Sequence, residues 1–369
     1  MGFHIVKREN CPLWKKAAFY LGAILIALLL GGMILLAIGV DPFAYYGRMF
    51  TMGTIGNRIA YKTFINYLIR WVPLALTALG LSLAFKMRFW NIGGEGQFIM
   101  GALASTAVAL LLGGKLPAAV MLIVMCLAGM LAAGIYGVLV AALKVKFGTN
   151  ETLLTLMLNY VALYILSYLM GTKASWNFFL KAEDLRPVPQ RLPENAMFPT
   201  FGLGGKFELN LCVILVILIA VAIHIYLKHT KQGYEINVVG DSPGTAKYAG
   251  MKTGRIVLRT VFLSACMIGL AAAFKMGTVG SLSTTITADV GWTGIIVAWL
   301  AQLNTWAILL VSALISLLHH GSVIAAATFK QVDSSFANML QGFILFLVLA
   351  ADFMIRFKLV RTKKEGNHG

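Results

Sequence analysis

The chain has 369 residues, of which 59% are hydrophobic and only 12% charged, and its mean hydropathy is +0.82. This composition excludes an ordinary soluble protein and predicts an all-α polytopic membrane protein. The formal net charge of +17 requires no nucleic acid partner, because basic residues gather at the cytoplasmic ends of membrane helices.

The N-terminal region contains the first expected membrane helix. An apolar run over residues 17–40 follows a basic stretch and exceeds the roughly 7 to 15 residues of a signal-peptide core. We therefore expect residues 1–16 to form a cytoplasmic N-terminus and the run to remain in the membrane.

Later apolar runs bring the prediction to about ten transmembrane helices, each of about 20 residues to cross a hydrocarbon core of about 30 Å. They lie near residues 64–85, 92–113, 117–143, 152–171, 209–227, 256–276, 289–303, 305–325 and 336–356. This topology places most of the 31 Lys and Arg residues on the cytoplasmic side, together with both termini. Residues 17–356 then form one transmembrane domain, and residues 357–369 a cytoplasmic tail.

Two features suggest internal symmetry and an irregular backbone. Residues 78–87 and 267–276 share Gly, Leu, Ala, Phe, Lys and Met at equivalent positions, which indicates either an inverted repeat or chance similarity between Leu- and Ala-rich helices. Glycines interrupt residues 277–325, which predicts either broken helices lining a pathway or an ordinary external loop.

A polar cluster follows the first copy of this similarity, at residues 89–97. Asn91, Glu95 and Gln97 stand among glycines between apolar runs, where they would offer hydrogen bonds to a polar solute. The alternative is a turn at the cytoplasmic interface.

The helix expected over residues 152–171 contributes a further candidate. Glu151 and Asn159 are eight residues apart and thus lie on similar faces of that helix. Asn159 is deep enough to line a pathway, whereas Glu151 at the helix start is explained by the helix dipole.

Two segments between helices are candidate interaction surfaces. The external loop 172–208 combines prolines, which stiffen it, with aromatic residues, which supply contact area; it predicts a docking site for another protein or a surface loop without one. The cytoplasmic loop 228–255 contains a short polar helix that Pro243 would start and Gly250 would end.

The sequence contains no motif that is typical of an enzyme active site. The chain lacks a phosphate-binding Gly-x-x-x-x-Gly-Lys-Ser/Thr loop, a metal-ligand constellation and a nucleophile–base pair, so we predict no catalytic residue, no metal and no cofactor. An ion-coupled secondary transporter remains an alternative, but its deep titratable residues would have to be Glu95 and Asp289.

Three motifs in order resemble a known family. They are Asn91–Gln97, Gly148–Thr152 leading to Met157–Tyr160, and Gly240–Met251. Together they resemble the permease subunits of bacterial ABC importers of the ribose and branched-chain amino acid permease superfamily, over residues 60–355. Within it, the chain is similar to the nucleoside or simple-sugar subgroup paired with basic-membrane-protein lipoproteins.

The resemblance implies a transport subunit, not an enzyme, in the bacterial cell membrane. It would form half of a pathway for a nucleoside or a simple sugar, with a second and often different permease subunit and an extracytoplasmic binding lipoprotein. A cytoplasmic ABC ATPase would bind ATP and Mg. The resemblance also implies that the coupling helix seated on the ATPase contains Asp241, Pro243, Gly244, Ala246, Ala249 and Gly250.

The chain departs from the family pattern at residues 290–301, where tryptophans replace smaller residues and Ala301 replaces a glycine. Trp292 would stack on a base or sugar, or anchor the helix at the membrane interface. With it, the predicted solute pathway comprises Asn91, Glu95, Gln97, Asn159 and Trp292.

Overall fold

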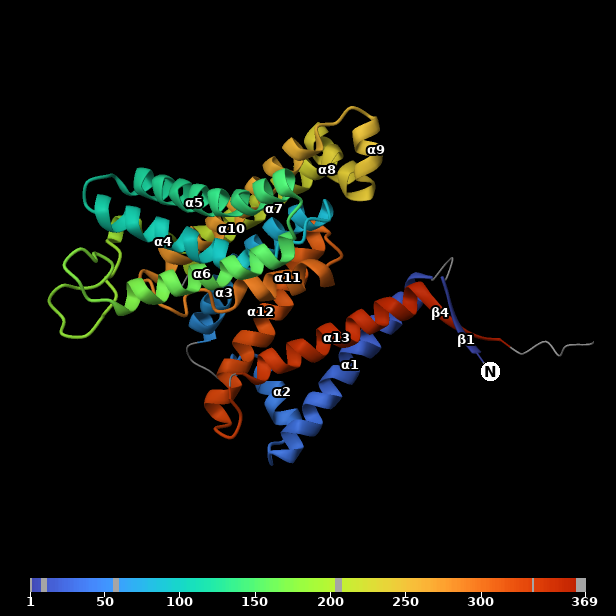
Figure 1. The fold of residues 1–369 in the computed structure, drawn as a ribbon. Helices are drawn as coiled ribbons and strands as arrows, with labels where there is room; N and C mark the ends of the chain where they lie inside the picture. Colours follow the sequence, from blue (N-terminus) through green and yellow to red (C-terminus); the bar gives the residue numbers. More distant parts are fainter. Residues whose placement is uncertain (1, 8–11, 56–59, 203–207, 334, 363–369) are drawn as a thin grey trace, which may run out of the picture. The chain divides into compact units, whose positions relative to one another are not determined.

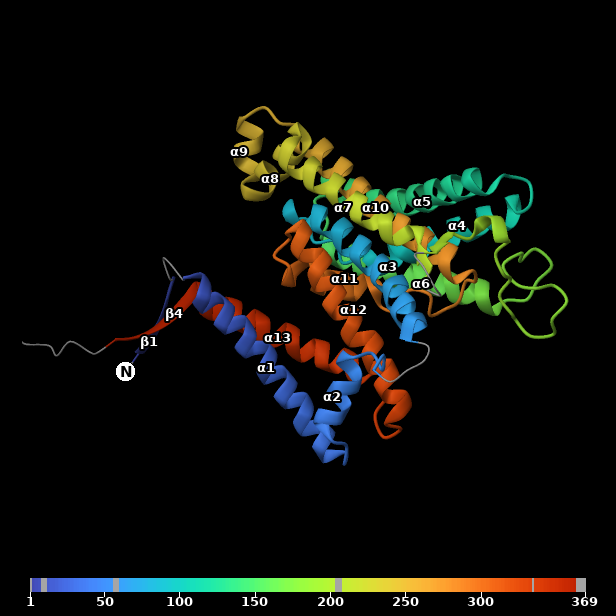
Figure 2. The same cartoon turned by 180° about the vertical axis from the view of Figure 1, so that it is seen from behind.

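A computed structural model describes residues 2–7, 12–55, 60–202, 208–333 and 335–362 (Figures 1 and 2). The chain divides into two units, Met1–Arg58 with Leu317–Gly369, and Ile59–Ser316. Among the described residues, nine helices are long and apolar enough to cross a membrane, which confirms the predicted all-α membrane fold. Parts of both predicted cytoplasmic tails, residues 1, 8–11 and 363–369, lie outside the described residues.

The larger unit is a bundle of long helices with a short helical insertion. Its first elements are α3 (Ala60–Lys86), α4 (Gly94–Leu112), α5 (Ala118–Phe147), α6 (Glu151–Gly171), η1 (Glu194–Ala196), β2 (Thr200–Gly202) and β3 (Glu208–Asn210). They are followed by α7 (Leu211–His229), α8 (Lys231–Asp241), α9 (Pro243–Tyr248), α10 (Thr253–Val279), α11 (Val290–Leu300) and the first part of α12 (Thr305–Thr328). The core is formed around α3 and α10, whose apolar windows are 83% and 72% buried, against 28% for α6.

Glycines allow the core helices to approach closely. α4, α5 and α10 meet at Gly101, Gly129 and Gly269, where a Cβ on Gly269 would lie 2.1 Å from the carbonyl oxygen of Gly129. α3 and α10 are joined by the Ser264 hydroxyl, which donates to the Gly80 carbonyl oxygen at 2.7 Å. Close backbone contact of this kind replaces the hydrophobic driving force that membrane helices lack.

The two similar segments lie on helices that run in opposite directions. The end of α3 and the start of α10 both adjoin α8, through Gly240 at Lys86 and an Arg259–Glu235 ion pair of 3.0 Å. The opposite end of α10 lies at Phe198, whose N–H donates to the carbonyl oxygen of Gly277. This direction is the one an inverted repeat requires; a common origin of the two copies stays a prediction.

The segments predicted on opposite sides of the membrane lie at opposite ends of the larger unit. α8 and α9 form one end, and the chain between α6 and α7 forms the other (Figures 1 and 2). This arrangement agrees with a cytoplasmic and an external segment, although the orientation in the membrane remains a prediction.

The crossing expected over residues 289–303 is a short helix. α11 has 11 residues and is therefore about 16 Å long, too short to span a membrane. Left-handed backbone conformations flank it, with Ala288 and Asp289 before it and Gln302 and Leu303 after it. A broken helix, one of the two alternatives for residues 277–325, therefore describes this region.

The smaller unit joins the two ends of the chain. It contains β1 (Gly2–Lys7), α1 (Leu13–Ala37), α2 (Pro42–Phe50), the end of α12, α13 (Phe336–Arg356) and β4 (Phe357–Thr362). α1 packs along α13, and β1 pairs antiparallel with β4, with Gly2 opposite Thr362. This strand pair was not predicted, because its two strands lie in segments that were expected to be cytoplasmic tails.

The glycine contacts make a direct prediction about stability. Gly269→Val should lower the apparent melting temperature of the detergent-solubilised protein, because the added atoms overlap the Gly129 backbone. A cost of about 1–3 kcal/mol is typical of overpacking. Gly22→Val on α1 is the control, since a Cβ there meets nothing within 4 Å. Equal melting temperatures for the two variants would contradict this packing.

Candidate solute cavity and coupling surface

Asn91, in the segment between α3 and α4 (residues 87–93), pairs with Gln97 on the first turn of α4, and both are predicted pathway residues. Asn91 and Gln97 are buried, and each amide nitrogen donates to the other's oxygen at 3.1 Å. The Asn91 oxygen also accepts from the Gly93 N–H at 3.1 Å. These amides therefore satisfy one another and fix the turn into α4.

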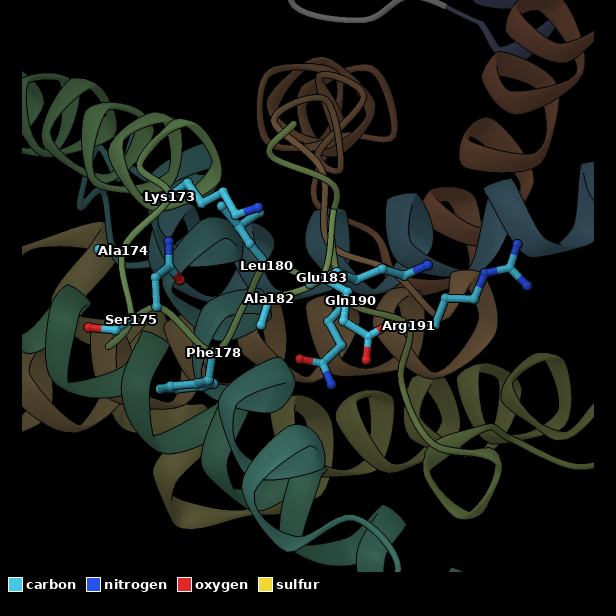
Figure 3. Close-up of a pocket in the computed structure, with 11 residues that line it drawn as sticks. Lys173, Ala174, Ser175, Phe178, Leu180, Ala182, Glu183, Gln190 and Arg191 are labelled. Carbon is cyan, nitrogen blue, oxygen red and sulfur yellow. The ribbon is translucent and has the colours of Figure 1, made fainter. Parts of the chain in front are cut away.

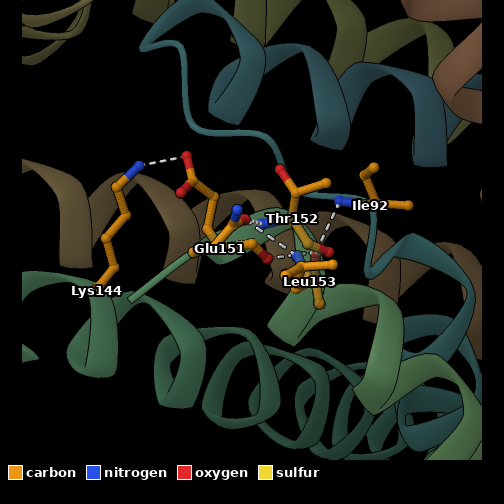
Figure 4. Close-up of polar contacts among 7 residues, drawn as sticks. Ile92, Lys144, Glu151, Thr152 and Leu153 are labelled. Atoms are coloured by element: carbon orange, nitrogen blue, oxygen red, sulfur yellow. Dashed lines mark hydrogen bonds and ion pairs between the residues drawn. The ribbon is translucent and has the colours of Figure 1, made fainter. Parts of the chain in front are cut away.

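Asn159 on α6 clamps the same segment from the other side. Its side-chain oxygen accepts from the Gly96 N–H, and its nitrogen donates to the Ile92 carbonyl oxygen, both at 2.8 Å. The Ile92 N–H donates in turn to the Thr155 hydroxyl at 3.2 Å (Figure 4). The loop backbone is thus paired with side chains of α6.

Glu95 ties α4 to α11. Its carboxylate is buried, and Oε2 accepts from the Gly291 N–H at 2.8 Å. Residue 291 must be glycine, because a Cβ there would lie 2.3 Å from the Glu95 nitrogen. The carboxylate therefore receives a backbone hydrogen bond at the first turn of a helix, which stabilises it in a buried setting.

A cavity of about 270 Å³ opens beside these contacts. It brings together three of the five predicted pathway residues, Glu95, Asn159 and Trp292. Its other lining residues are Tyr160, Leu163, Thr284, Thr285, Thr287, Ala288 and Asp289. Asn91 and Gln97 are not among them, and their amides bond to each other.

The cavity lining combines hydrogen-bonding groups with one large aromatic ring. Carboxylates accept hydrogen bonds from hydroxyl or amino groups, threonines both donate and accept, and Trp292 offers a flat face. Tyr160 and the threonines were not among the predicted pathway residues. The Thr-rich run just before α11 was a usable signal, and it lies in residues 277–325, which were predicted to be either broken helices lining a pathway or an external loop.

Glu151 lies outside this cavity, in the first turn of α6, where the sequence predicted a structural role at the helix start. It forms an ion pair with Lys144 across the turn between α5 and α6 (Figure 4). The cap of α6 is Asn150, whose oxygen accepts from the N–H groups of Thr152 and Leu153 at 3.0 and 3.2 Å.

α8 and α9, which we call the handle, lie in the loop 228–255 that was predicted to be cytoplasmic, and only α9 was predicted as a helix. Pro243 starts α9 as predicted, the Ser242 hydroxyl caps it by accepting from the Thr245 N–H at 3.2 Å, and Gly250 follows its end in a left-handed conformation. Asp241, Pro243, Gly244, Ala249 and Gly250 are exposed.

Two residues of the handle differ from expectation. Ala246 is fully buried, so it packs α9 within this chain and presents no surface for a partner. Tyr248 is 96% exposed and was missed. An aromatic ring at the end of a short polar helix was its only sequence signal.

α8 rests directly on the end of α3. A Cβ on Gly240 would lie 2.0 Å from the carbonyl oxygen of Lys86 and 3.3 Å from the Met87 Cα. Only glycine permits this approach. Residues 87–93, which lead to Glu95 and the cavity, therefore begin at the contact with the handle.

The chain between α6 and α7 encloses a second, larger cavity of about 1110 Å³ (Figure 3). Lys173, Lys181, Glu183, Gln190 and Arg191 are among the residues around it. Bridges at Leu180–Pro189 and Arg191–Ser281 fold this segment back on the bundle. Residues 203–207 of the predicted external loop lie outside the described residues.

Residues 63–349 match the family described as the branched-chain amino acid transport system / permease component. The chain belongs to this permease family. This confirms the superfamily predicted from the three motifs, and it makes the chain a transport subunit with several membrane helices.

Three relatives align over nearly the whole chain. The glucose ABC transporter permease protein TsgB13 of Haloferax volcanii is 27% identical, covering 98% of this chain and 94% of its own. The nucleoside ABC transporter permease protein NupB of Lactococcus lactis subsp. cremoris is 27% identical, covering 95% and 94%. The guanosine ABC transporter permease protein NupP of Bacillus subtilis is 26% identical, covering 93% and 96%.

The role of Glu95 can be tested by separating its charge from its hydrogen bond. Glu95→Gln keeps an oxygen that accepts from Gly291, so solute uptake should stay within about threefold of wild type. Glu95→Leu leaves the Gly291 N–H unpaired and should lower uptake about tenfold or more, since an unsatisfied buried donor costs about 1–3 kcal/mol.

Tyr164→Phe is the control and should leave uptake unchanged, because the exposed Tyr164 ring is on α6 but does not line this cavity. Loss of uptake in Glu95→Gln as severe as in Glu95→Leu would show that the charge is required. That result would favour ion coupling over the hydrogen-bonding role.

Proposed function

We propose that this chain is the permease subunit of an ATP-driven importer and forms half of the pathway for a nucleoside or related riboside. The observation that carries the proposal is the contact of α8 with the end of α3 at Gly240. Through residues 87–93, this contact connects the exposed handle with the polar cavity. The names of NupB and NupP support the solute class.

The chemistry of the cavity supports a neutral polar solute with a flat ring. Hydroxyl groups of a ribose fit the carboxylate, amide and threonine groups, and Trp292 offers a face for a base. A simple sugar is the second candidate, favoured by the glucose permease among the relatives, because its hydroxyls would use the same lining groups.

Three partners complete the proposed transporter. A cytoplasmic ABC ATPase supplies ATP and Mg and seats on α8 and α9. A second permease subunit supplies the other half of the pathway. An extracytoplasmic binding lipoprotein docks on the segment between α6 and α7, where exposed Lys173, Lys181 and Arg191 surround the larger cavity.

Alternating access in this proposal is driven from outside the chain. The loaded lipoprotein opens the external side, ATP-driven closure of the ATPases displaces α8 and α9, and the seat at Gly240 transfers the displacement to α3. The handle must therefore bind one ATPase state more tightly than the other.

Tyr248 tests the handle. Tyr248→Ala should lower ATP-driven uptake about tenfold while leaving expression unchanged, because exposed aromatic rings often dominate the energy of an interface. Gly244→Asp should act similarly, since it adds charge to the exposed face. Tyr164→Ala, which removes an exposed ring from α6, is the control. Normal uptake by both handle variants would refute the coupling assignment.

Co-purification in mild detergent tests the class of transporter. We expect an ATPase to accompany the chain and its ATP hydrolysis to rise with nucleoside-loaded binding protein. Stimulation by a glucose-loaded binding protein instead would select the sugar alternative. A chain that purifies without any ATPase, and transports without ATP, would favour a secondary transporter.

A further inference from the structure

α11 presents two tryptophans on one face. Trp292 and Trp299 are seven residues apart, so they point in nearly the same direction and are separated by about 10 Å along the axis. Gly294 and Val297 are buried on the opposite side. Trp292 lines the smaller cavity, and Trp299 lies about two helical turns further along the same face of α11.

Trp299 is stacked on Trp90. Their ring centroids are 5.2 Å apart with an interplanar angle of 17°, and the ring of Phe85 lies 5.6 Å from that of Trp299. Trp90 is 46% exposed and Trp299 36%, so the stack is at a surface and is not core packing. It joins the end of α11 to residues 87–93.

Residues 87–93 connect this stack to both functional regions. At one end Met87 adjoins Gly240 of α8, and at the other Ile92 is held by Thr155 and Asn159. Trp90 is only three residues from Met87, so a displacement of α8 against α3 would also move the ring of Trp90.

α11 is suited to move as a short unit. Its two ends are linked to the chain by the left-handed pairs at residues 288–289 and 302–303, where the helical hydrogen-bond pattern stops. Such backbone conformations cost about 1–3 kcal/mol each at residues other than glycine and concentrate at switch regions and ligand sites.

We propose that the Trp90–Trp299 stack is the inner gate of the solute pathway. With the rings stacked, the route along α11 from the cavity is closed. Movement of α8 on α3 parts the rings, and the freed aromatic faces then stack against the base of a nucleoside as it leaves. This inference rests on the proposed function and adds the gate and its two residues to it.

The test uses the assembled transporter in liposomes that are preloaded with radiolabelled guanosine and kept without ATP. Trp90→Ala and Trp299→Ala should each speed efflux by roughly two- to tenfold, the range allowed by the energy of one aromatic pair. The double variant should leak no faster than the single ones, because each breaks the same contact. Trp90→Phe keeps a ring and should leak little.

Trp306→Ala is the matched control. Trp306 is 47% exposed, and its ring contacts His224 at 5.5 Å on a different part of the bundle. Its efflux should equal that of the wild type. If efflux from Trp306→Ala were as fast as that from Trp90→Ala, the loss of any surface tryptophan would explain the leak, and the gate proposal would be overturned.

A second measurement does not depend on the stability of the alanine variants. Oxidative cross-linking of Trp90→Cys with Trp299→Cys should block ATP-driven uptake, and a reductant should restore it. Undiminished uptake after complete cross-linking would overturn the proposal.

The efflux assay separates failure of the gate from failure of the proposed function. Unchanged efflux in both alanine variants that still assemble and hydrolyse ATP would overturn the gate while leaving the importer function intact. Wild-type protein without an ATPase and without ATP-driven uptake would instead reject the importer function.

Discussion

The arrangement of the larger unit depends on how residues 87–93 satisfy their backbone hydrogen bonds inside a helix bundle. An unpaired buried N–H or carbonyl group is costly, and a membrane supplies no water to compensate. Here the N–H groups of Met87, Arg88 and Phe89 return to the last turn of α3, while Asn91 and Thr155 accept those of Gly93 and Ile92. The irregular turn is thereby fixed, and α4 starts where Glu95 meets α11.

Close contacts at two glycines join α3 and α4, the helices on either side of residues 87–93, to α8 and α11. Gly240 brings α8 onto the last carbonyl groups of α3, and Gly291 brings α11 onto the backbone of Glu95. In both places a side chain would separate elements that now touch. Packed backbones of this kind have few intermediate arrangements, so a movement at the handle shifts whole elements. The lining of the smaller cavity comes from α4, α6, α11 and residues 284–289, and the contact at Gly291 joins α4 to α11 within it.

Much of this architecture was predictable from the sequence because its signals are local. Apolar run length predicted the membrane helices, and Pro243 and Gly250 predicted the limits of α9, because each residue constrains its own backbone. The three-dimensional role of Asn91 and Gln97 was not predictable, since a buried amide that bonds solute and one that bonds another amide look identical in sequence. Likewise, the burial of Ala246 and the exposure of Tyr248 depend on how α9 turns against its neighbours.

The placement of Glu95 bears on how energy enters transport. A proton-coupled carrier needs a buried carboxyl group that gains and loses its proton as the solute moves. Glu95 is engaged instead with the protein backbone, because its Oε2 accepts a hydrogen bond from the Gly291 N–H at the start of α11. Its hydrogen bond also holds two elements of the cavity wall together. A group in this position serves better as a fixed acceptor than as a proton carrier, which agrees with the proposal that a partner ATPase drives the cycle.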